Sequence, residues 1–132
     1  MSDNPTLLLV EDEGLISVTL EEELVSAGFG VLVVDSGDAA VAELRADASR
    51  FRALITDIRL GAGTDGWAVA HTAREVCATM PVVYISGDSA VNWAANGVPE
   101  SIMLPKPFAP AQLVTAVSTL INKADAVRLR GS

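Results

Sequence analysis

The stretch Leu54-Ile55-Thr56-Asp57-Ile58-Arg59-Leu60 decides the fold of this chain. Its apolar residues have the composition of a buried strand, yet it contains a carboxylate, Asp57. Burying a carboxylate inside a sheet would cost several kcal/mol, so a core strand can present an acid only at its end. A single aspartate of this kind is often a turn residue or a helix cap. The alternative is a functional group at the end of a buried strand.

Three other apolar runs also end in polar groups. Leu7-Leu8-Leu9-Val10 leads into Glu11-Asp12-Glu13, Val82-Val83-Tyr84-Ile85 leads into Ser86, and Ile102-Met103-Leu104-Pro105 leads into Lys106. In an open parallel sheet the carboxyl ends of the strands border one crevice, where ligands bind. The residues that we expect to meet in this crevice are Glu11, Asp12, Asp57, Ser86 and Lys106.

Strand-like runs alternate with helical patterns along the chain. The expected strands are 7–10, 31–34, 51–57, 82–86 and 102–104. The expected helices are 14–27, a second helix marked by Ala40, Val41 and Leu44 that fades by Ala48, and then 67–79, 90–96 and 109–122. This alternation predicts an α/β fold with a doubly wound, five-stranded parallel sheet and five helices. The 132 residues suit one domain, over 1–122, and we expect 123–132 to be a frayed C-terminal tail.

The composition excludes several classes of function. Seventeen acids against nine Lys and Arg residues give a formal net charge of −8. That charge repels phosphate backbones, so we expect no direct contact with nucleic acid. No stretch approaches the roughly 18 apolar residues of a membrane span, and we expect no signal peptide at the N-terminal residues, which lack a basic segment and a long apolar run. The single cysteine, Cys77, cannot form an internal disulfide, so we expect a cytoplasmic protein without a membrane partner.

The expected crevice has the residues for phosphoryl transfer. Crowded acids repel one another unless a cation lies among them, and hard oxygen ligands with water in the remaining positions suit Mg²⁺. A metal bound at Asp12 and Asp57 would neutralise a phosphoryl group during an in-line transfer in which one carboxylate attacks phosphorus. Lys106 would direct its charge to a phosphoryl oxygen, and the Ser86 hydroxyl would donate a hydrogen bond.

At these residues the sequence resembles the receiver domain of bacterial two-component response regulators, of the single-domain, CheY-like type. The resemblance covers residues 6 to about 122. Val10-Glu11-Asp12-Glu13 resembles the acidic pair of the family, Asp57 its phosphoacceptor and Ser86 its Ser/Thr switch, and Leu104-Pro105-Lys106-Pro107-Phe108 resembles its lysine motif. Each motif is weak by itself, but together they occur in the order and spacing of the family.

This resemblance implies a flavodoxin-like strand order of 2-1-3-4-5. It also implies that Asp57 takes a phosphoryl group from a histidine kinase or a histidine phosphotransfer protein, with Mg²⁺ required. Such a protein catalyses only its own phosphorylation and dephosphorylation. The implied metal-binding groups are Asp12, Asp57, the carbonyl of Arg59 and, through water, Glu11. The bond between Lys106 and Pro107 would be cis.

Partners follow from the same resemblance. The phosphorylated state would be read by a separate output protein, and a dimer could form through the face of the fourth helix, fifth strand and fifth helix. Four features depart from the family. Glu11 stands where aspartate is commoner, Met103 stands where the family usually has Tyr or Phe, and the loop 57–66 is one residue longer than usual. The fourth is that no effector domain follows in this sequence, which is why we expect the output protein to be a separate chain.

Two other functions share part of this residue set. A phosphatase of the haloacid dehalogenase type also uses an Asp nucleophile, a Ser or Thr, a Lys and Mg²⁺. That class needs a second acid two residues after the nucleophile, where this chain has Arg59. A degenerate receiver would keep the acidic pocket as a binding module and would never be phosphorylated. The presence of every phosphorylation group argues against it.

The first expected helix has apolar residues on two faces. At about 100° per residue, its core stripe centres near Leu20, whereas Leu15, Val18 and Val25 lie on the opposite face. Scattered exposed aliphatic residues are ordinary. Here they follow the acidic pair, so we predict that a helical phosphodonor contacts Leu15 and Val18.

Overall fold

The chain folds around one parallel sheet, which the computed structural model describes together with its helices over residues 6–87 and 92–131. The strands lie in the order β2-β1-β3-β4-β5. Their bounds are β1 (Thr6–Val10), β2 (Gly30–Val34), β3 (Phe51–Asp57), β4 (Val82–Ser86) and β5 (Ile102–Pro105). The predicted fold class and strand order are therefore confirmed.

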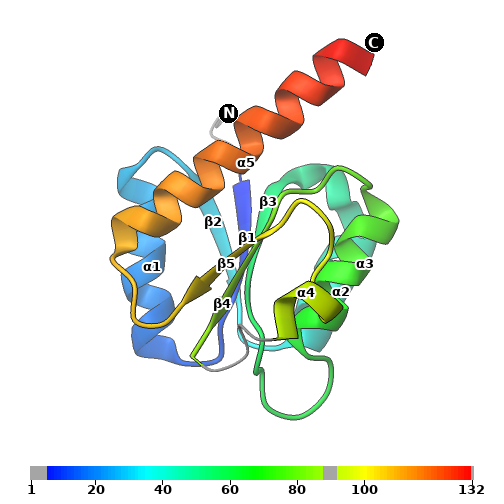
Figure 1. Cartoon of the computed structure of the whole chain (residues 1–132). Helices are drawn as coiled ribbons and strands as arrows, with labels where there is room; N and C mark the ends of the chain where they lie inside the picture. Colours follow the sequence, from blue (N-terminus) through cyan, green and yellow to red (C-terminus); the bar gives the residue numbers. More distant parts are fainter. Residues whose placement is uncertain (1–5, 88–91, 132) are drawn as a thin grey trace.

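The helices with bounds in the described part of the chain lie between the strands or follow the last one. They are α1 (Gly14–Ser26), α2 (Gly37–Asp47), η1 (Ala48–Arg50), α3 (Gly66–Val76), α4 (Trp93–Asn96) and α5 (Pro110–Gly131). Helices α1 and α5 cover one face of the sheet, and α2 and α3 cover the other (Figure 1). Residues 90 and 91 of the predicted fourth helix lie outside the described residues.

Alternation along the strands divides the core in two. Leu7 and Leu9 pack with α1 and α5, whereas Leu8 and Val10 pack with α2 and α3. Successive side chains of a strand point to opposite faces, and a parallel sheet is covered on both. This burial explains why the strands are largely apolar runs whose charged residues stand at or near the ends.

Helices α2 and α3 begin with side-chain caps at the carboxyl edge of the sheet. Ser36 Oγ accepts a hydrogen bond from the amide of Ala39 at 3.1 Å, and Asp65 Oδ1 accepts one from the amide of Ala68 at 2.9 Å. Such caps stabilise a helix by about 0.5–2 kcal/mol because they satisfy amides that have no partner within the helix. Both helix starts are thereby fixed beside the strand ends.

The last helix is longer than the sequence predicted. Helix α5 continues to Gly131, so the predicted helix end near Asn122 is wrong. Its distal part is tied on two sides: Arg52 Nη2 donates to both carboxylate oxygens of Asp125 at 2.9 Å, and Lys123 Nζ donates to Glu100 Oε2 at 2.5 Å. The division of the chain after residue 122 stays a prediction.

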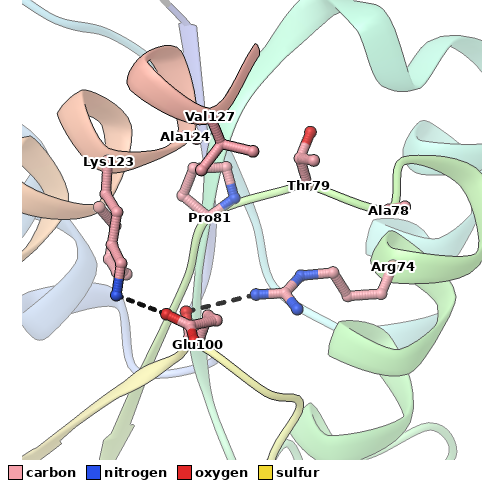
Figure 2. A pocket seen from close by; sticks show the side chains of 9 residues that line it. Arg74, Ala78, Thr79, Pro81, Glu100, Lys123, Ala124 and Val127 are labelled. Carbon is pink, nitrogen blue, oxygen red and sulfur yellow. Dashed lines mark hydrogen bonds and ion pairs between the residues drawn. The ribbon is translucent and has the colours of Figure 1, made fainter. Parts of the chain in front are cut away.

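A hollow of about 310 Å³ lies beside this distal part of α5. Figure 2 shows Glu100 between Lys123 and Arg74 at its rim, with Pro81 among its lining residues. Pro81 directly precedes β4, so the hollow lies at the amino end of the strands, away from Asp57. In the described ranges, none of the helices has the length and apolar character needed to cross a membrane.

Candidate functional site

The carboxyl ends of four strands form one edge on which the predicted site residues stand. Asp57 is the last residue of β3 and pairs in register with Ile85, the neighbour of Ser86. Ser86 ends β4, and its carbonyl accepts a hydrogen bond from the amide of Lys106 at 2.8 Å. Hydrogen bonding thus continues beyond the strands and fixes the backbone that carries these side chains.

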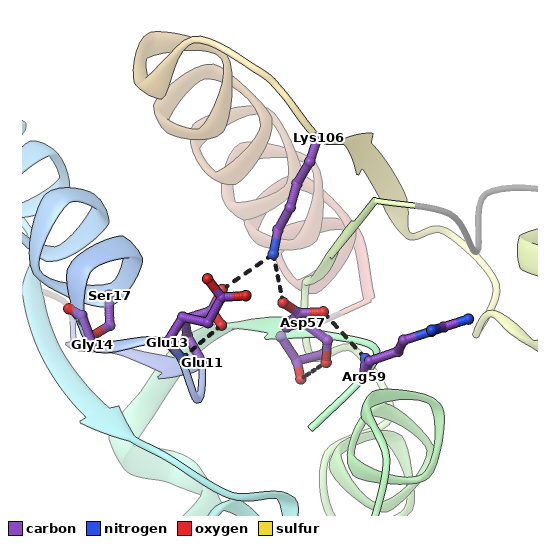
Figure 3. A network of polar contacts seen from close by, with 8 residues as sticks. Glu11, Glu13, Gly14, Ser17, Asp57, Arg59 and Lys106 are labelled. Atoms are coloured by element: carbon purple, nitrogen blue, oxygen red, sulfur yellow. Dashed lines mark hydrogen bonds and ion pairs between the residues drawn. The ribbon is translucent and has the colours of Figure 1, made fainter. Parts of the chain in front are cut away.

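Lys106 links two of the acids. Its ammonium donates to Asp57 Oδ2 at 2.7 Å and lies 3.6 Å from Glu11 Oε1 (Figure 3). Burial by itself would lower the pKa of Lys106, but the hydrogen bond to Asp57 and the negative charges nearby raise it above its ordinary value. Lys106 therefore stays cationic at neutral pH.

Asp57 is held through both carboxylate oxygens. Oδ2 receives the Lys106 hydrogen bond, and Oδ1 accepts the amide of Arg59 at 3.2 Å. The residue is 6% exposed, so its side chain is oriented by its partners yet borders solvent. A carboxylate oriented in this way can attack an electrophile with one of its oxygens.

Glu11 is almost fully buried, at 2% exposure. Its Oε2 accepts the amide of Glu13 at 3.1 Å, whereas Oε1 has no hydrogen-bond partner. Burial is the main cause that raises the pKa of Glu11, to about 7, and the charge of Asp57 adds to it. The Glu13 amide and the Lys106 charge oppose this rise. A buried carboxylate oxygen without a hydrogen bond is costly unless a cation binds nearby.

Three carboxylates could hold a metal ion. Oxygen atoms of Glu11, Asp12 and Asp57 lie within 4.8 Å of one another, and Asp12 is exposed. Opposite ligands of an octahedral Mg²⁺ are about 4.2 Å apart, because each metal–oxygen bond is about 2.1 Å. The size of the cluster and its oxygen ligands fit a hard divalent cation whose remaining ligands are waters, and Glu11 Oε1, which has no hydrogen bond and lies 3.6 Å from Lys106 Nζ, borders this cluster.

The sequence predicted that the charged side chains meet at this edge, but it did not reveal a close backbone contact between Gly66 and Asp57. A Cβ atom added at Gly66 would overlap the carbonyl oxygen of Asp57. Any other residue there would displace the end of β3, so Gly66 supports the position of Asp57. The only signal in the sequence is a glycine directly after the cap residue Asp65, which does not reveal what it approaches.

Comparison with known proteins identifies the family. The family model described as the response regulator receiver domain matches residues 7–118. The chain belongs to the response regulator receiver domain family. The predicted resemblance is confirmed, and the chain is a receiver domain of two-component systems.

Solved receiver structures share its fold. A response regulator receiver protein from Sinorhizobium medicae WSM419 is 48% identical, with a TM-score of 0.90, and the match covers 92% of this chain and 98% of that chain. The receiver domain of sensor histidine kinase PA1611 from Pseudomonas aeruginosa PAO1 is 25% identical, with a TM-score of 0.76, over 90% of this chain and 98% of that chain. That structure has a magnesium ion coordinated in its active-site cleft.

Two curated relatives are transcriptional regulatory proteins. PrrA of Mycobacterium leprae is 30% identical over 131 residues, which cover 98% of this chain and 55% of PrrA. CusR of Escherichia coli K12 is 30% identical over 124 residues, which cover 92% of this chain and 53% of CusR. This receiver domain thus spans about half the length of these two relatives.

Proposed function

We propose that Asp57 of this receiver domain accepts a phosphoryl group from a histidine kinase or a histidine phosphotransfer protein. The observation that carries the proposal is the 2.7 Å hydrogen bond between Lys106 Nζ and Asp57 Oδ2, beside the carboxylates of Glu11 and Asp12. The site therefore combines an oriented nucleophile, Asp57, with a cation for a phosphoryl oxygen, Lys106, and a carboxylate cluster that fits Mg²⁺.

In the proposed transfer, one carboxylate oxygen of Asp57 attacks phosphorus in line with the leaving group. A new O–P bond forms as the P–N bond of the donor phosphohistidine breaks, and the imidazole leaves with the electron pair. Lys106 moves from the carboxylate to a phosphoryl oxygen, and the Ser86 hydroxyl donates to another. Hydrolysis of the acyl phosphate by water returns Asp57 to its free form.

The residues proposed to hold Mg²⁺ are Asp12, Asp57, the carbonyl of Arg59 and, through water, Glu11. Bound Mg²⁺ supplies neutralisation of the charge on the phosphoryl oxygens. The magnesium ion in the P. aeruginosa receiver domain supports the choice of metal. Lys106 and the metal site together would offset the charges that otherwise repel the donor phosphate.

The proposal includes a separate output protein and a cytoplasmic location. A dimer through α4, β5 and α5 is also proposed. Its support is that β5 is an edge strand, with Ile102 and Leu104 only half-buried beside α5. An edge strand with apolar side chains is a natural surface for another chain.

Acetyl phosphate tests the proposal without a cognate kinase. We expect incubation with acetyl phosphate and Mg²⁺ to add one phosphoryl group, detected by intact mass, as an acid-stable and base-labile adduct. Asp57→Asn should abolish the adduct, since the amide is a poor nucleophile. Asp47→Asn is the matched control, because Asp47 is an exposed acid at the far end of α2. Chelation of Mg²⁺ should also prevent labelling.

Other outcomes would favour the competing functions. Continuous release of phosphate without an accumulating adduct would indicate a phosphatase, although Arg59 occupies the position where that class needs an acid. No reaction with either acetyl phosphate or a phosphohistidine donor would indicate a binding module. Full labelling of Asp57→Asn would refute the assignment of the phosphoacceptor.

A further inference from the structure

The loop 58–65 connects β3 to α3 at the carboxyl edge of the sheet (Figure 1, green). Its two ends are joined by a hydrogen bond from the amide of Gly66 to the carbonyl of Ile58, at 2.9 Å. Near its start, the amide of Arg59 donates to Asp57 Oδ1. The loop therefore closes on itself directly beside the proposed phosphoacceptor.

The first turn of α2 holds the far side of this loop. Asp38 Oδ1 accepts two hydrogen bonds from Thr64, one from its amide at 3.2 Å and one from its hydroxyl at 2.5 Å. Gly37 lies so close that an added Cβ would overlap the carbonyl oxygen of Thr64. Gly63 has φ +92, and a Cβ there would meet Asp38 Oδ2 at 3.1 Å. Three residue pairs thus connect the loop to α2, namely Asp38 with Thr64, Gly37 with Thr64 and Asp38 with Gly63. Two of these pairs involve the Asp38 carboxylate.

The same loop also approaches the second acid of the proposed metal site. A Cβ built on Gly61, which has φ +73, would lie 3.9 Å from Asp12 Oδ2. The loop therefore borders Asp12 through Gly61 and Asp57 through the Arg59 amide. A shift of the loop would change the distances from the Arg59 carbonyl to the carboxylates of Asp12 and Asp57.

We propose that Asp38 is a positioning residue for the metal site. By binding Thr64, it holds the loop 58–65 in place, and with it the backbone of Arg59, whose amide donates to Asp57 Oδ1, and Gly61, which lies beside Asp12. This inference rests on the proposed function in taking that cluster as the Mg²⁺ site. A site that is already ordered binds more tightly, because no ordering of the loop has to accompany binding. Freeing the loop should therefore weaken Mg²⁺ binding while the nucleophile itself is untouched.

Four variants separate this role from general effects on charge or folding. Asp38→Ala removes both hydrogen bonds with Thr64, whereas Asp38→Asn keeps an oxygen that can accept them and removes the charge. Thr64→Ser keeps a hydroxyl donor. Asp47→Ala is the matched control, because it removes an exposed acid from the same helix at the end away from the loop. The carboxylate of Asp47 also accepts a hydrogen bond from an exposed hydroxyl, that of Ser49.

The primary measurement is the Mg²⁺ dissociation constant of the unphosphorylated protein, from amide NMR shifts during titration with MgCl₂. We expect Asp38→Ala to weaken binding about 10-fold, in the range found when groups that orient metal ligands are removed. Asp38→Asn and Thr64→Ser should stay near the wild-type value, and Asp47→Ala should not change it. Amide hydrogen exchange in 58–65 should accelerate in Asp38→Ala alone. Labelling at saturating Mg²⁺ should remain close to wild type.

Each outcome decides the inference separately from the proposed function. An unchanged Mg²⁺ dissociation constant in Asp38→Ala overturns the positioning role, even if Asp57 is labelled normally. Equal weakening by Asp38→Asn and Asp38→Ala overturns it as well, because the effect would then be one of charge. Weaker Mg²⁺ binding in Asp38→Ala, with no labelling of the wild type, would keep the positioning role and refute the phosphoacceptor. Absence of Mg²⁺ binding by the wild type would overturn both.

Discussion

Lys106 Nζ lies 2.7 Å from Asp57 Oδ2 and 3.6 Å from Glu11 Oε1, so one ammonium serves two carboxylates. Before the proposed transfer, this cation would compete with a metal ion for the same negative charge. After it, the Asp57 oxygen would be part of an acyl phosphate, and the strongest acceptors available to Lys106 would be the phosphoryl oxygens. The same side chain would therefore restrain the free site and stabilise the phosphorylated one.

Lys106→Met should separate these two roles, because methionine has a similar length and no charge. We expect the rate of labelling by acetyl phosphate to fall by about 10²–10³, the cost of removing one preorganised donor to a developing charge. The affinity for Mg²⁺ should stay the same or increase, since the competing cation is gone. Initial labelling rates and MgCl₂ titrations measure the two quantities.

The control for this substitution is Lys123→Met, at an exposed lysine near the opposite end of the strands. A loss of Mg²⁺ affinity in Lys106→Met would contradict the competition.

Tyr84→Phe should lower the stability of the domain. The buried Tyr84 hydroxyl accepts a hydrogen bond from the amide of Val98 at 3.0 Å, and phenylalanine leaves that amide without a partner. The free energy of unfolding at pH 7 should fall by about 1–3 kcal/mol, measured by urea denaturation. The contact between the rings of Trp67 and residue 84, with centroids 4.8 Å apart in the wild type, should persist.

The stability difference between the wild type and Tyr84→Phe should also depend on pH. Burial raises the pKa of Tyr84 above its ordinary value of 10.0, so the folded protein keeps a proton that the unfolded chain releases. The part of the unfolding free energy that depends on protonated Tyr84 is therefore complete in the wild type below about pH 10. It is lost as the pH rises through the pKa that Tyr84 has in the folded protein. Tyr84→Phe lacks this loss, so the difference in unfolding free energy should narrow above pH 10. A constant difference would mean that Tyr84 does not contribute to the pH dependence.

Met103 should make the conformational response graded. It is half-buried, pairs in register with Tyr84 on β4 and packs against the core cluster that includes Val98. Methionine is flexible and has no preferred ring geometry, so it can adjust continuously as Ser86 moves toward a phosphoryl group. Methyl NMR of Met103 with and without beryllofluoride, a phosphoryl mimic, tests this. We expect one averaged signal that shifts, and two discrete signals would contradict the prediction. Met103→Tyr provides the comparison with an aromatic side chain.

The sequence predicted the strands and the charged groups of the site because that information is local. A short apolar run ending in a polar residue identifies a strand end, and the rule for parallel sheets then brings Asp57, Ser86 and Lys106 to one edge. The distal part of α5, beyond Asn122, could not be predicted in the same way. Its ion pairs join Arg52 to Asp125, 73 residues apart, and Glu100 to Lys123, 23 residues apart. No local pattern contains such contacts.

The same limit applies within the site. The hydrogen bonds between Asp38 and Thr64 depend on the path of the loop 58–65, which its glycines permit but do not specify. The raised pKa of Glu11 depends on how deeply β1 ends within the fold, so the sequence could predict an acid there and not its protonation. Chemistry that depends on residue type was therefore predictable, and chemistry that depends on burial and loop path was not.

The exposed face of α1 is confirmed. Leu15 is 89% exposed, Val18 is 52% and Val25 is 53%, whereas Leu20 and Leu24 are buried in the core. Helix α1 begins at Gly14, three residues after Glu11, so its first turn adjoins the proposed phosphorylation site. A helical phosphodonor that brings phosphohistidine to Asp57 would meet Leu15 and Val18 first.

Replacing both Leu15 and Val18 with Ser should slow transfer from a phosphorylated donor protein by about 10-fold, equivalent to about 1.4 kcal/mol of lost contact. Labelling by acetyl phosphate should be unchanged, because this small donor does not touch α1. Both side chains are exposed, so the change in folding stability should stay within about 0.5 kcal/mol for each. Val25→Ser, at an exposed residue near the far end of α1, is the control. Equal loss of both reactions would mean that the helix had been damaged, and loss of neither would mean that the donor docks on another face.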